Sequence, residues 1–240
     1  MDNQIAVKKF GLSANTIKYI AIIAMLIDHI AWAFVNTNSM LGQIMHIIGR
    51  TTAPIMCFFI AEGYYKTSNL KKYIGRLAIF SVISYFAFTF EHTGHFLTVY
   101  NFGVILTLML GLIALAVCKD NKIPLYAKII TVVFLCFVST MGDWPIFGVL
   151  YILAFGLNHS NFKKQILWFS IISVAMVSLA SLMDIHSWYW NLFQLGVFLA
   201  VPILYFYNGQ RGKGGKFNKW VFYIFYPLHL IILGLFKYYI

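Results

Sequence analysis

Nine apolar runs follow one another along this chain of 240 residues, separated by short polar connections. A helix needs about 20 consecutive, mostly apolar residues to cross a bilayer, and most of the runs approach that length. They lie near residues 17–35, 46–64, 73–90, 101–118, 123–141, 144–157, 163–183, 188–207 and 219–238. The sequence therefore predicts an all-α fold, a polytopic transmembrane helical bundle of about nine spans that forms one domain over residues 1–240.

The composition supports this prediction. Apolar residues make up 61% of the chain and charged residues only 10%, whereas soluble domains have about 45–50% and about 25%. Membrane lipids are thus the expected surroundings, and no room remains for a soluble catalytic domain. The net charge of +11 would suggest nucleic acid in a soluble protein, but here we expect no nucleic-acid partner. Three cysteines without metal-like spacing lead us to expect no metal.

The basic residues indicate how the chain crosses the membrane. Sixteen of the eighteen lie before or at the start of the first run or around the second, fourth, sixth and eighth connections, and the odd-numbered connections hold none. The positive-inside rule then predicts a cytoplasmic N-terminus and an outer C-terminus. The short run 144–157 could be re-entrant, but the basic residues that follow it would then lie on the outer side of the membrane. We therefore expect it to cross.

Polar residues interrupt several runs at similar depth. Asp28 and His29 lie past the middle of the first run, and a charge near the centre of a span costs about 2.5–3.5 kcal/mol. Arg50 lies a little over one turn inside the outer end of the second run, with His46 four residues earlier on the same helical face. His229 lies near the middle of the ninth run. Such groups predict a polar site inside the bundle.

Other polar residues lie nearer the ends of the runs. Asn101 and Asp143 open the fourth and sixth runs on the outer side, where they could form the rim of a substrate site. Glu62 lies toward the cytoplasmic end of its run, one turn before Lys66, and is a further candidate polar residue of the substrate site. An ordinary helix pair is the simpler interpretation of Glu62 and Lys66.

Plainer interpretations exist for the other polar residues too. Asp28 and Arg50 could form a purely structural ion pair, and His229 could simply satisfy a backbone carbonyl. Glu91, His92 and His95 make a polar outer connection that offers only a weak metal site, because no further ligand is obvious.

Several segments resemble the TraX family, which is named for a membrane protein that acetylates pilin subunits. They occur in family order from about residue 13 to 235. They are Met25-Leu-Ile-Asp-His29, Gly49-Arg-Thr-Thr-Ala-Pro54 leading to Glu62-Gly63, Lys72-Tyr-Ile-Gly-Arg-Leu77, Asn101 with Thr107-Leu-Met-Leu-Gly111, Gly142-Asp-Trp144 with Gly148, Tyr207-Asn-Gly209 and Phe225-Tyr-Pro-Leu-His-Leu230. Thr51-Thr52 stands where the family commonly has a bulky apolar residue after Gly-Arg.

The resemblance implies an integral-membrane acyltransferase of the bacterial cytoplasmic membrane, with acetyl-CoA as the donor. The acceptor would be an amine or a hydroxyl. A pilin N-terminus is the acceptor of the family's namesake, and for this chain a protein N-terminus, a glycan or a small molecule all stay open.

Acyl transfer needs a base and a positive group for the developing oxyanion. His29 suits the base, and Asp28 could orient another member of the site or pair with Arg50. Arg50 could instead polarise the thioester carbonyl. His229 is the alternative base, or a relay if a covalent intermediate forms.

Basic residues of the cytoplasmic connections could hold the phosphates of the coenzyme. The candidates are Lys66, Lys72, Arg76 and Arg211. These residues could equally serve only as topology determinants.

Two rival functions remain open. Intramembrane Asp, His and Arg also build the proton relays of transporters, so a proton-coupled carrier is the main alternative, although no internal repeat is evident. In a non-catalytic scaffold, buried charges would only fix helix register.

Overall fold

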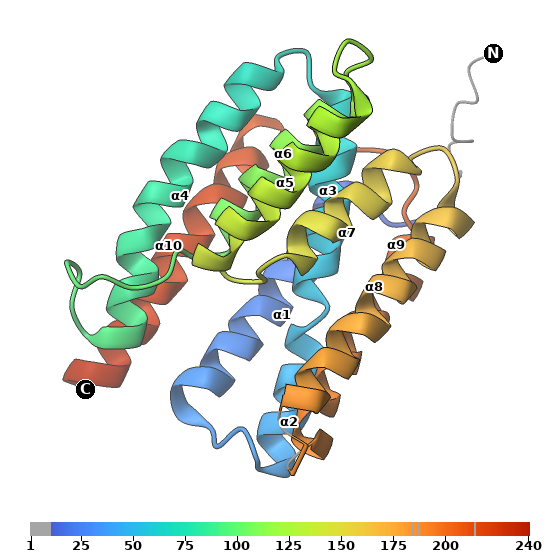
Figure 1. Ribbon diagram of the computed structural model, residues 1–240. Helices are drawn as coiled ribbons and strands as arrows, with labels where there is room; N and C mark the ends of the chain where they lie inside the picture. The colour runs from blue at the N-terminus through green and yellow to red at the C-terminus, as the bar shows by residue number, and fades with distance from the viewer. Residues whose placement is uncertain (1–10, 184, 187, 214) are drawn as a thin grey trace.

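The fold is known from a computed structural model that describes residues 11–183, 185–186, 188–213 and 215–240. Helices account for every regular element in these residues (Figure 1). The first half holds α1 (Ala14–Phe34), α2 (Met40–Gly49), α3 (Thr52–Lys66), α4 (Leu70–Thr93) and α5 (Val104–Lys119). The second half holds α6 (Leu125–Val138), η1 (Ser139–Met141), α7 (Phe147–Leu157), α8 (Phe162–Met183), η2 (Trp188–Leu199), α9 (Ala200–Tyr205) and α10 (Gly215–Tyr239).

The predicted all-α bundle is confirmed. Each of the nine predicted runs corresponds, within the described residues, to one helix or to helices that follow in line. The segments α2–α3 and η2–α9 each make one interrupted span. Six segments are long and apolar enough to cross a bilayer, namely α1, α2–α3, α4, α8, η2–α9 and most of α10. The chain is therefore a multi-pass membrane protein.

The interruption between α2 and α3 occurs at Arg50 and Thr51. The Thr51 hydroxyl donates to the carbonyl of Ile48 at 2.7 Å, and the Thr52 hydroxyl donates to the carbonyl of Ala21 in α1 at 2.9 Å. Gly49 lies just before the break, where a Cβ atom would overlap the side chain of Asp28. Glycine is thus required for α2 to approach α1 closely at this point.

Three helices are too short to cross on their own. The helices α5, α6 and α7 have 16, 14 and 11 residues, or about 24, 21 and 16 Å at 1.5 Å per residue, against about 30 Å of hydrocarbon. In Figure 1 they gather in the upper part of the bundle, whereas α1, α2 and α8 continue further down. The connection between α6 and α7 therefore lies beside the bundle interior rather than at its lower end.

Contacts between distant parts of the chain show that the basic connections share one end of the bundle. Leu12 pairs with Tyr207, and His159 contacts Glu62 at 2.7 Å. Lys119 lies 5.7 Å from the ring centre of Tyr65. These contacts join the start of α1 to the connections after α3, α5, α7 and α9, which we call the basic end. This arrangement is the one that the alternation of basic connections predicts. Lys8, Lys9 and the side chains of Lys216 and Lys219 lie outside the described residues.

The core and the lipid-facing surface differ in burial. Helix α7 is almost wholly enclosed, with Tyr151, Ile152 and Phe155 inaccessible to solvent. Helix α6 is the opposite, because Leu135 is the one buried residue among its fourteen. Apolar side chains on the outer face of α6 suit contact with lipid, as expected for a helix at the edge of a membrane bundle.

Candidate functional site

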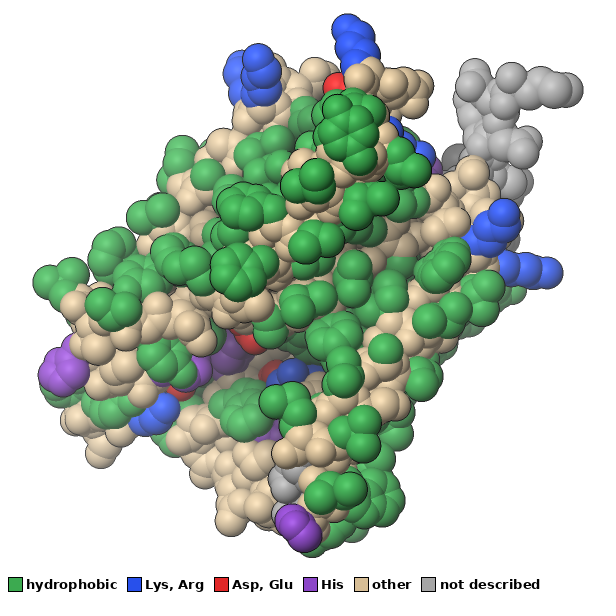
Figure 2. Space-filling view, in the orientation of Figure 1, with side chains coloured by type: hydrophobic (Ala, Val, Ile, Leu, Met, Phe, Trp, Pro, Cys, Tyr) green, Lys and Arg blue, Asp and Glu red, His purple; other side chains and the backbone are tan. Residues whose placement is uncertain are grey.

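A cavity of about 630 Å³ lies among α1, α3, α4, α5 and α10. Helix α1 lines it with Asn15, Lys18, Met25, Asp28, His29 and Trp32. The 17-residue separation of Asn15 and Trp32 corresponds to about 26 Å along a helix. The cavity thus extends through most of the hydrocarbon thickness and joins the basic end to the polar residues beyond the middle of the bundle. Figure 2 shows acidic, basic and histidine side chains inside a hollow in an otherwise largely apolar face.

Asp28 is bound by two partners that both come from the second span. Its Oδ1 accepts a hydrogen bond from His46 Nδ1 at 2.8 Å, and its Oδ2 accepts one from Arg50 Nη2 at 3.0 Å. The side chain of His46 is fully buried and that of Asp28 is 13% exposed. The ion pair of Asp28 with Arg50, which the sequence predicts as one option, is therefore present. Asp28 makes no hydrogen bond to the neighbouring imidazole of His29 among the described contacts.

Arg50 lies in an aromatic enclosure. Its guanidinium carbon is 5.1 Å from the ring centre of Trp144, 5.2 Å from that of Phe193 and 6.0 Å from that of Trp32. Rings at these distances stabilise a cation. The Nε of Arg50 is buried and has no hydrogen-bond partner among the described residues. A donor without a partner therefore remains beside the cavity.

The imidazoles of His29 and His229 contact each other across the bundle. Nδ1 of His29 lies 2.9 Å from the carbonyl oxygen of Met25, and Nδ1 of His229 lies 2.8 Å from that of Phe225. A carbonyl oxygen only accepts, so both Nδ1 atoms carry the hydrogen in the neutral rings. His229 Nε2 then presents its lone pair to His29 Nδ1 at 3.1 Å. The Nε2 of His29 keeps a lone pair with no protein partner among the described contacts.

A neighbouring ring of α10 holds His229 in place. The ring of His229 stacks on that of Phe225 at 4.8 Å, and its side chain is buried. As the sequence allowed, His229 satisfies a backbone carbonyl. It also contacts His29, which that simpler interpretation does not require.

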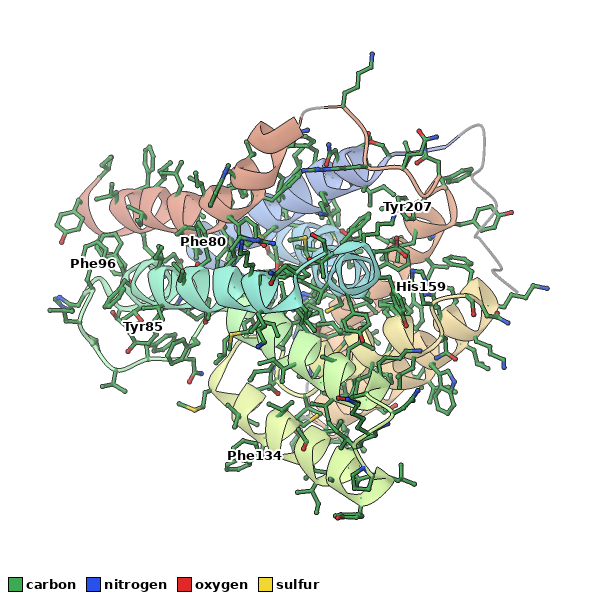
Figure 3. The ribbon with its side chains drawn as sticks, turned by 90° about the horizontal axis from the view of Figure 1, so that it is seen from above. Phe80, Tyr85, Phe96, Phe134, His159 and Tyr207 are labelled. Atoms are coloured by element: carbon green, nitrogen blue, oxygen red, sulfur yellow. The ribbon has the colours of Figure 1, made fainter. Side chains whose placement is uncertain are left out.

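A second polar cluster lies at the basic end, around Glu62. Its Oε1 is 2.7 Å from His159 Nε2, and its Oε2 is 2.8 Å from Lys66 Nζ. Lys66 also donates to the Tyr207 hydroxyl at 2.7 Å, and that hydroxyl donates to Glu62 at 3.4 Å. Burial raises the pKa of the Tyr207 phenol, which keeps it protonated as a donor. Figure 3 shows His159 and Tyr207 on separate elements at this end. Glu62 and Lys66 thus belong to a network rather than to an isolated helix pair.

The cations predicted to hold coenzyme phosphates divide into two groups. Lys66, Arg76 and Arg211 line the cavity toward the basic end, whereas Lys72 is exposed and outside the lining. Sequence reasoning missed Lys18, which also lines the cavity. Its Nζ lies 5.1 Å and 5.5 Å from the ring centres of Phe59 and Phe222. Its position at the start of an apolar run indicated only a topology determinant.

The structure brings one of the two predicted rim residues to the cavity. Asp143 lines the cavity beside Trp144, whose backbone N–H donates to Asp143 Oδ1 at 2.9 Å. Asn101 is exposed and does not line it. Helix α5 begins only at Val104, after Gly103. Asn101 therefore lies in the connection before the helix.

The sequence assigned no role of their own to two further residues at the clusters. His46 shares Asp28, and its spacing of four residues from Arg50 was the available signal. His159 shares Glu62, and nothing in its local sequence indicates that role, since it lies in a polar connection after α7.

A polytopic helical bundle with carboxylate, guanidinium and imidazole groups around a membrane-depth cavity defines an integral membrane protein with an intramembrane polar site. The family model described as TraX protein matches residues 13–237, and the chain belongs to the TraX family. It is 30% identical over 239 residues to the "Probable fimbrial assembly protein FimC, serogroup H1" of Dichelobacter nodosus, covering 94% of this chain and 96% of that relative. No solved structure matches the chain.

Proposed function

We propose that this protein is a membrane acyltransferase that moves an acetyl group from acetyl-CoA to an acceptor nucleophile, in the bacterial cytoplasmic membrane. The observation that carries the proposal is a cavity whose lining includes cations at the basic end and, deeper in the bundle, His29, which contacts His229. Membership of the TraX family and the fimbrial assembly name of the relative support a pilin-type subunit as the acceptor, with its N-terminal amine as the nucleophile.

The charge distribution supports entry of the donor from the basic end. Lys18, Arg76 and Arg211 line this part of the cavity together with Lys66, and cations are the natural partners of the phosphates of a coenzyme. Lys18 and His29 are 11 residues apart on one helix, or about 16 Å. The extended pantetheine arm of acetyl-CoA can bridge such a distance, which would bring its thioester to His29 while the phosphates stay near the cytoplasm.

The geometry around His29 supports a role at the reacting thioester. Its Nε2 lone pair is available, and its Nδ1–H donates to Met25 and faces His229 Nε2. A positive charge that develops on the His29 ring is then stabilised by two acceptors. The nearby Arg50 guanidinium retains a buried N–H without a protein partner, which suits stabilisation of an oxyanion on the thioester carbonyl.

Labelled acetyl-CoA tests the proposal. Purified protein in lipid nanodiscs is incubated with acetyl-CoA labelled in the acetyl group and with a peptide that has a free N-terminal amine. We expect label on the peptide and release of CoA, and no label on the same peptide when its N-terminus is blocked. Solute flux in vesicles without acyl chemistry would favour the proton-coupled carrier. The absence of both acyl transfer and solute flux would favour a scaffold.

A further inference from the structure

A third imidazole–carboxylate pair faces the cavity at the end of α4 that lies away from the basic end. Glu91 Oε2 lies 2.8 Å from His92 Nδ1, and the Glu91 side chain is only 3% exposed. Both residues line the cavity that holds His29. Within the described residues, His29 and His92 are the two histidines in that lining.

The hydrogen bonds of His92 fix its tautomer. Its Nδ1 lies 2.9 Å from the carbonyl oxygen of Phe88 and 2.8 Å from Glu91, and both partners accept. Nδ1 therefore carries the hydrogen, and Nε2 keeps a lone pair that no described residue binds. This is the arrangement of a general base, in which a carboxylate orients the ring and stabilises its protonated form.

Neighbouring side chains hold the pair rigidly. The His92 ring lies 4.1 Å from the ring of Phe88 and 5.0 Å from that of Tyr100. Lys237 lies 3.5 Å from Oε1 of Glu91, which leaves Oε2 to His92. A base held from several sides keeps its lone pair in one direction.

A purely structural role would be to anchor the end of α10 on α4. Two of the contacts that do so use backbone carbonyls, since Lys237 donates to the Glu91 carbonyl at 3.1 Å and the Tyr238 hydroxyl donates to the His92 carbonyl at 2.7 Å. The third joins Lys237 to Glu91 Oε1 and does not use the His92 side chain. Any residue at position 92 would supply the carbonyl that binds Tyr238. The anchor therefore does not account for an imidazole whose free nitrogen adjoins a cavity.

We propose that His92, oriented by Glu91, deprotonates the acceptor, while His29 Nε2 carries the acetyl group between donor and acceptor. The inference rests on the proposed acetyltransferase function. It follows from which imidazole nitrogens near the cavity still have a free lone pair after His29 is acetylated. Once His29 Nε2 is acetylated it cannot act as a base, and the Nε2 of His229 faces His29 Nδ1. His92 is then the cavity-lining imidazole that remains.

The first step transfers the acetyl group from CoA to His29, and the second transfers it from His29 to the acceptor. His29 Nε2 bonds to the acetyl carbonyl carbon, the C–S bond breaks, and CoA leaves as a thiolate that is protonated by water. The Nδ1 proton of the acetylated ring moves to His229 Nε2. The acceptor amine then attacks the acetyl carbon and loses its proton to His92 Nε2. The bond to His29 breaks, His29 recovers its proton from His229, and His92 releases its proton to water.

Two assays separate the two steps. Exchange of radiolabelled CoA into acetyl-CoA requires only the first step, whereas transfer to a peptide with a free N-terminal amine requires both. In His92→Gln we expect exchange within about twofold of the native rate and transfer reduced by about 100-fold or more, the scale of a lost general base. In His92→Ala, added imidazole should restore part of the transfer. His95→Gln is the matched control, because His95 is exposed on the connection that follows α4 and lies outside the cavity lining.

Several outcomes would overturn the inference. Native transfer in His92→Gln would remove His92 from the reaction. Loss of exchange together with transfer, in both His92→Gln and His92→Asn, would assign it a structural role only. Transfer without exchange in the native protein would exclude the acetylated His29, while the enzyme itself would stand. A native protein with neither activity would instead count against the proposed function.

Discussion

The imidazoles of His29 and His229 lie 200 positions apart in sequence, yet His29 Nδ1 and His229 Nε2 are 3.1 Å from each other. This contact joins α1 to α10 at the depth of the candidate site. The backbone carbonyls of Met25 and Phe225 determine which nitrogen of each ring carries a hydrogen. The contact therefore leaves His29 as the ring with a free lone pair and His229 as the ring that positions it.

The first prediction concerns this positioning role. His229→Phe keeps a ring but removes the lone pair that faces His29, so we expect kcat for acetyl transfer to fall about 100-fold. The KM for acetyl-CoA should stay unchanged. His229→Gln should recover part of the loss, because its amide oxygen can accept from His29 Nδ1. Equal loss in both variants would show that His229 acts through packing alone.

The second prediction concerns the Asp28 cluster. Asp28→Asn leaves the Arg50 charge without its counterion inside the bundle, and breaking a buried pair in this way costs about 3–5 kcal/mol. We expect a clear fall in the thermal unfolding midpoint in detergent. Asp28→Asn combined with Arg50→Met should unfold at a higher temperature than Asp28→Asn alone. Asp120→Asn, at an exposed aspartate, is the control, and equal effects at positions 28 and 120 would contradict the prediction.

The third prediction concerns donor binding at the basic end. Lys18→Met and Arg76→Met should each raise the KM for acetyl-CoA by about 10- to 100-fold, because a hydrogen bond to a charged group contributes about 1.5–3 kcal/mol. The kcat should change little. Lys72→Met should leave the KM unaltered, since Lys72 is exposed and outside the cavity lining. If all three variants had the same KM for acetyl-CoA, the coenzyme would not bind at the basic end of the cavity.

The fourth prediction concerns membrane topology. In a variant whose native cysteines are replaced by serine, Leu97→Cys should react with a membrane-impermeant maleimide added to intact cells. Lys122→Cys should react only after the membrane is opened, because basic connections stay in the cytoplasm. Both positions lie in exposed connections, so access is not limited by burial. Labelling of Lys122→Cys in intact cells would invert the predicted orientation.

Much of the fold could be predicted from the sequence because lipid imposes strong rules. A backbone in hydrocarbon must be helical, so apolar runs locate the helices, and the cost of a buried charge makes Asp28 and Arg50 natural partners. The interruption at Arg50 and Thr51 was not foreseen. It depends on how closely α2 approaches α1 at Gly49, which local sequence does not reveal.

The site was predictable only in part. Lys18 and His159 occupy positions whose local sequence is typical of solvent-facing ends, and tertiary packing alone brings them to a cavity or to Glu62. Asn101 shows the converse, because the predicted run began three residues before α5 does. Tautomers are also beyond sequence reasoning, since they depend on which carbonyl lies beside each ring.

A sided assay tests the central claim most directly, which is that one cavity connects a donor at the basic end to a nucleophile beyond the middle of the bundle. Acetyl-CoA is enclosed in proteoliposomes that hold the native protein or His29→Ala, and a peptide with a free N-terminal amine is added outside. We predict acetylated peptide outside with the native protein and none with His29→Ala at equal amounts of folded protein. Acetylation that occurs only when donor and peptide share one side, or that survives in His29→Ala, would contradict the account.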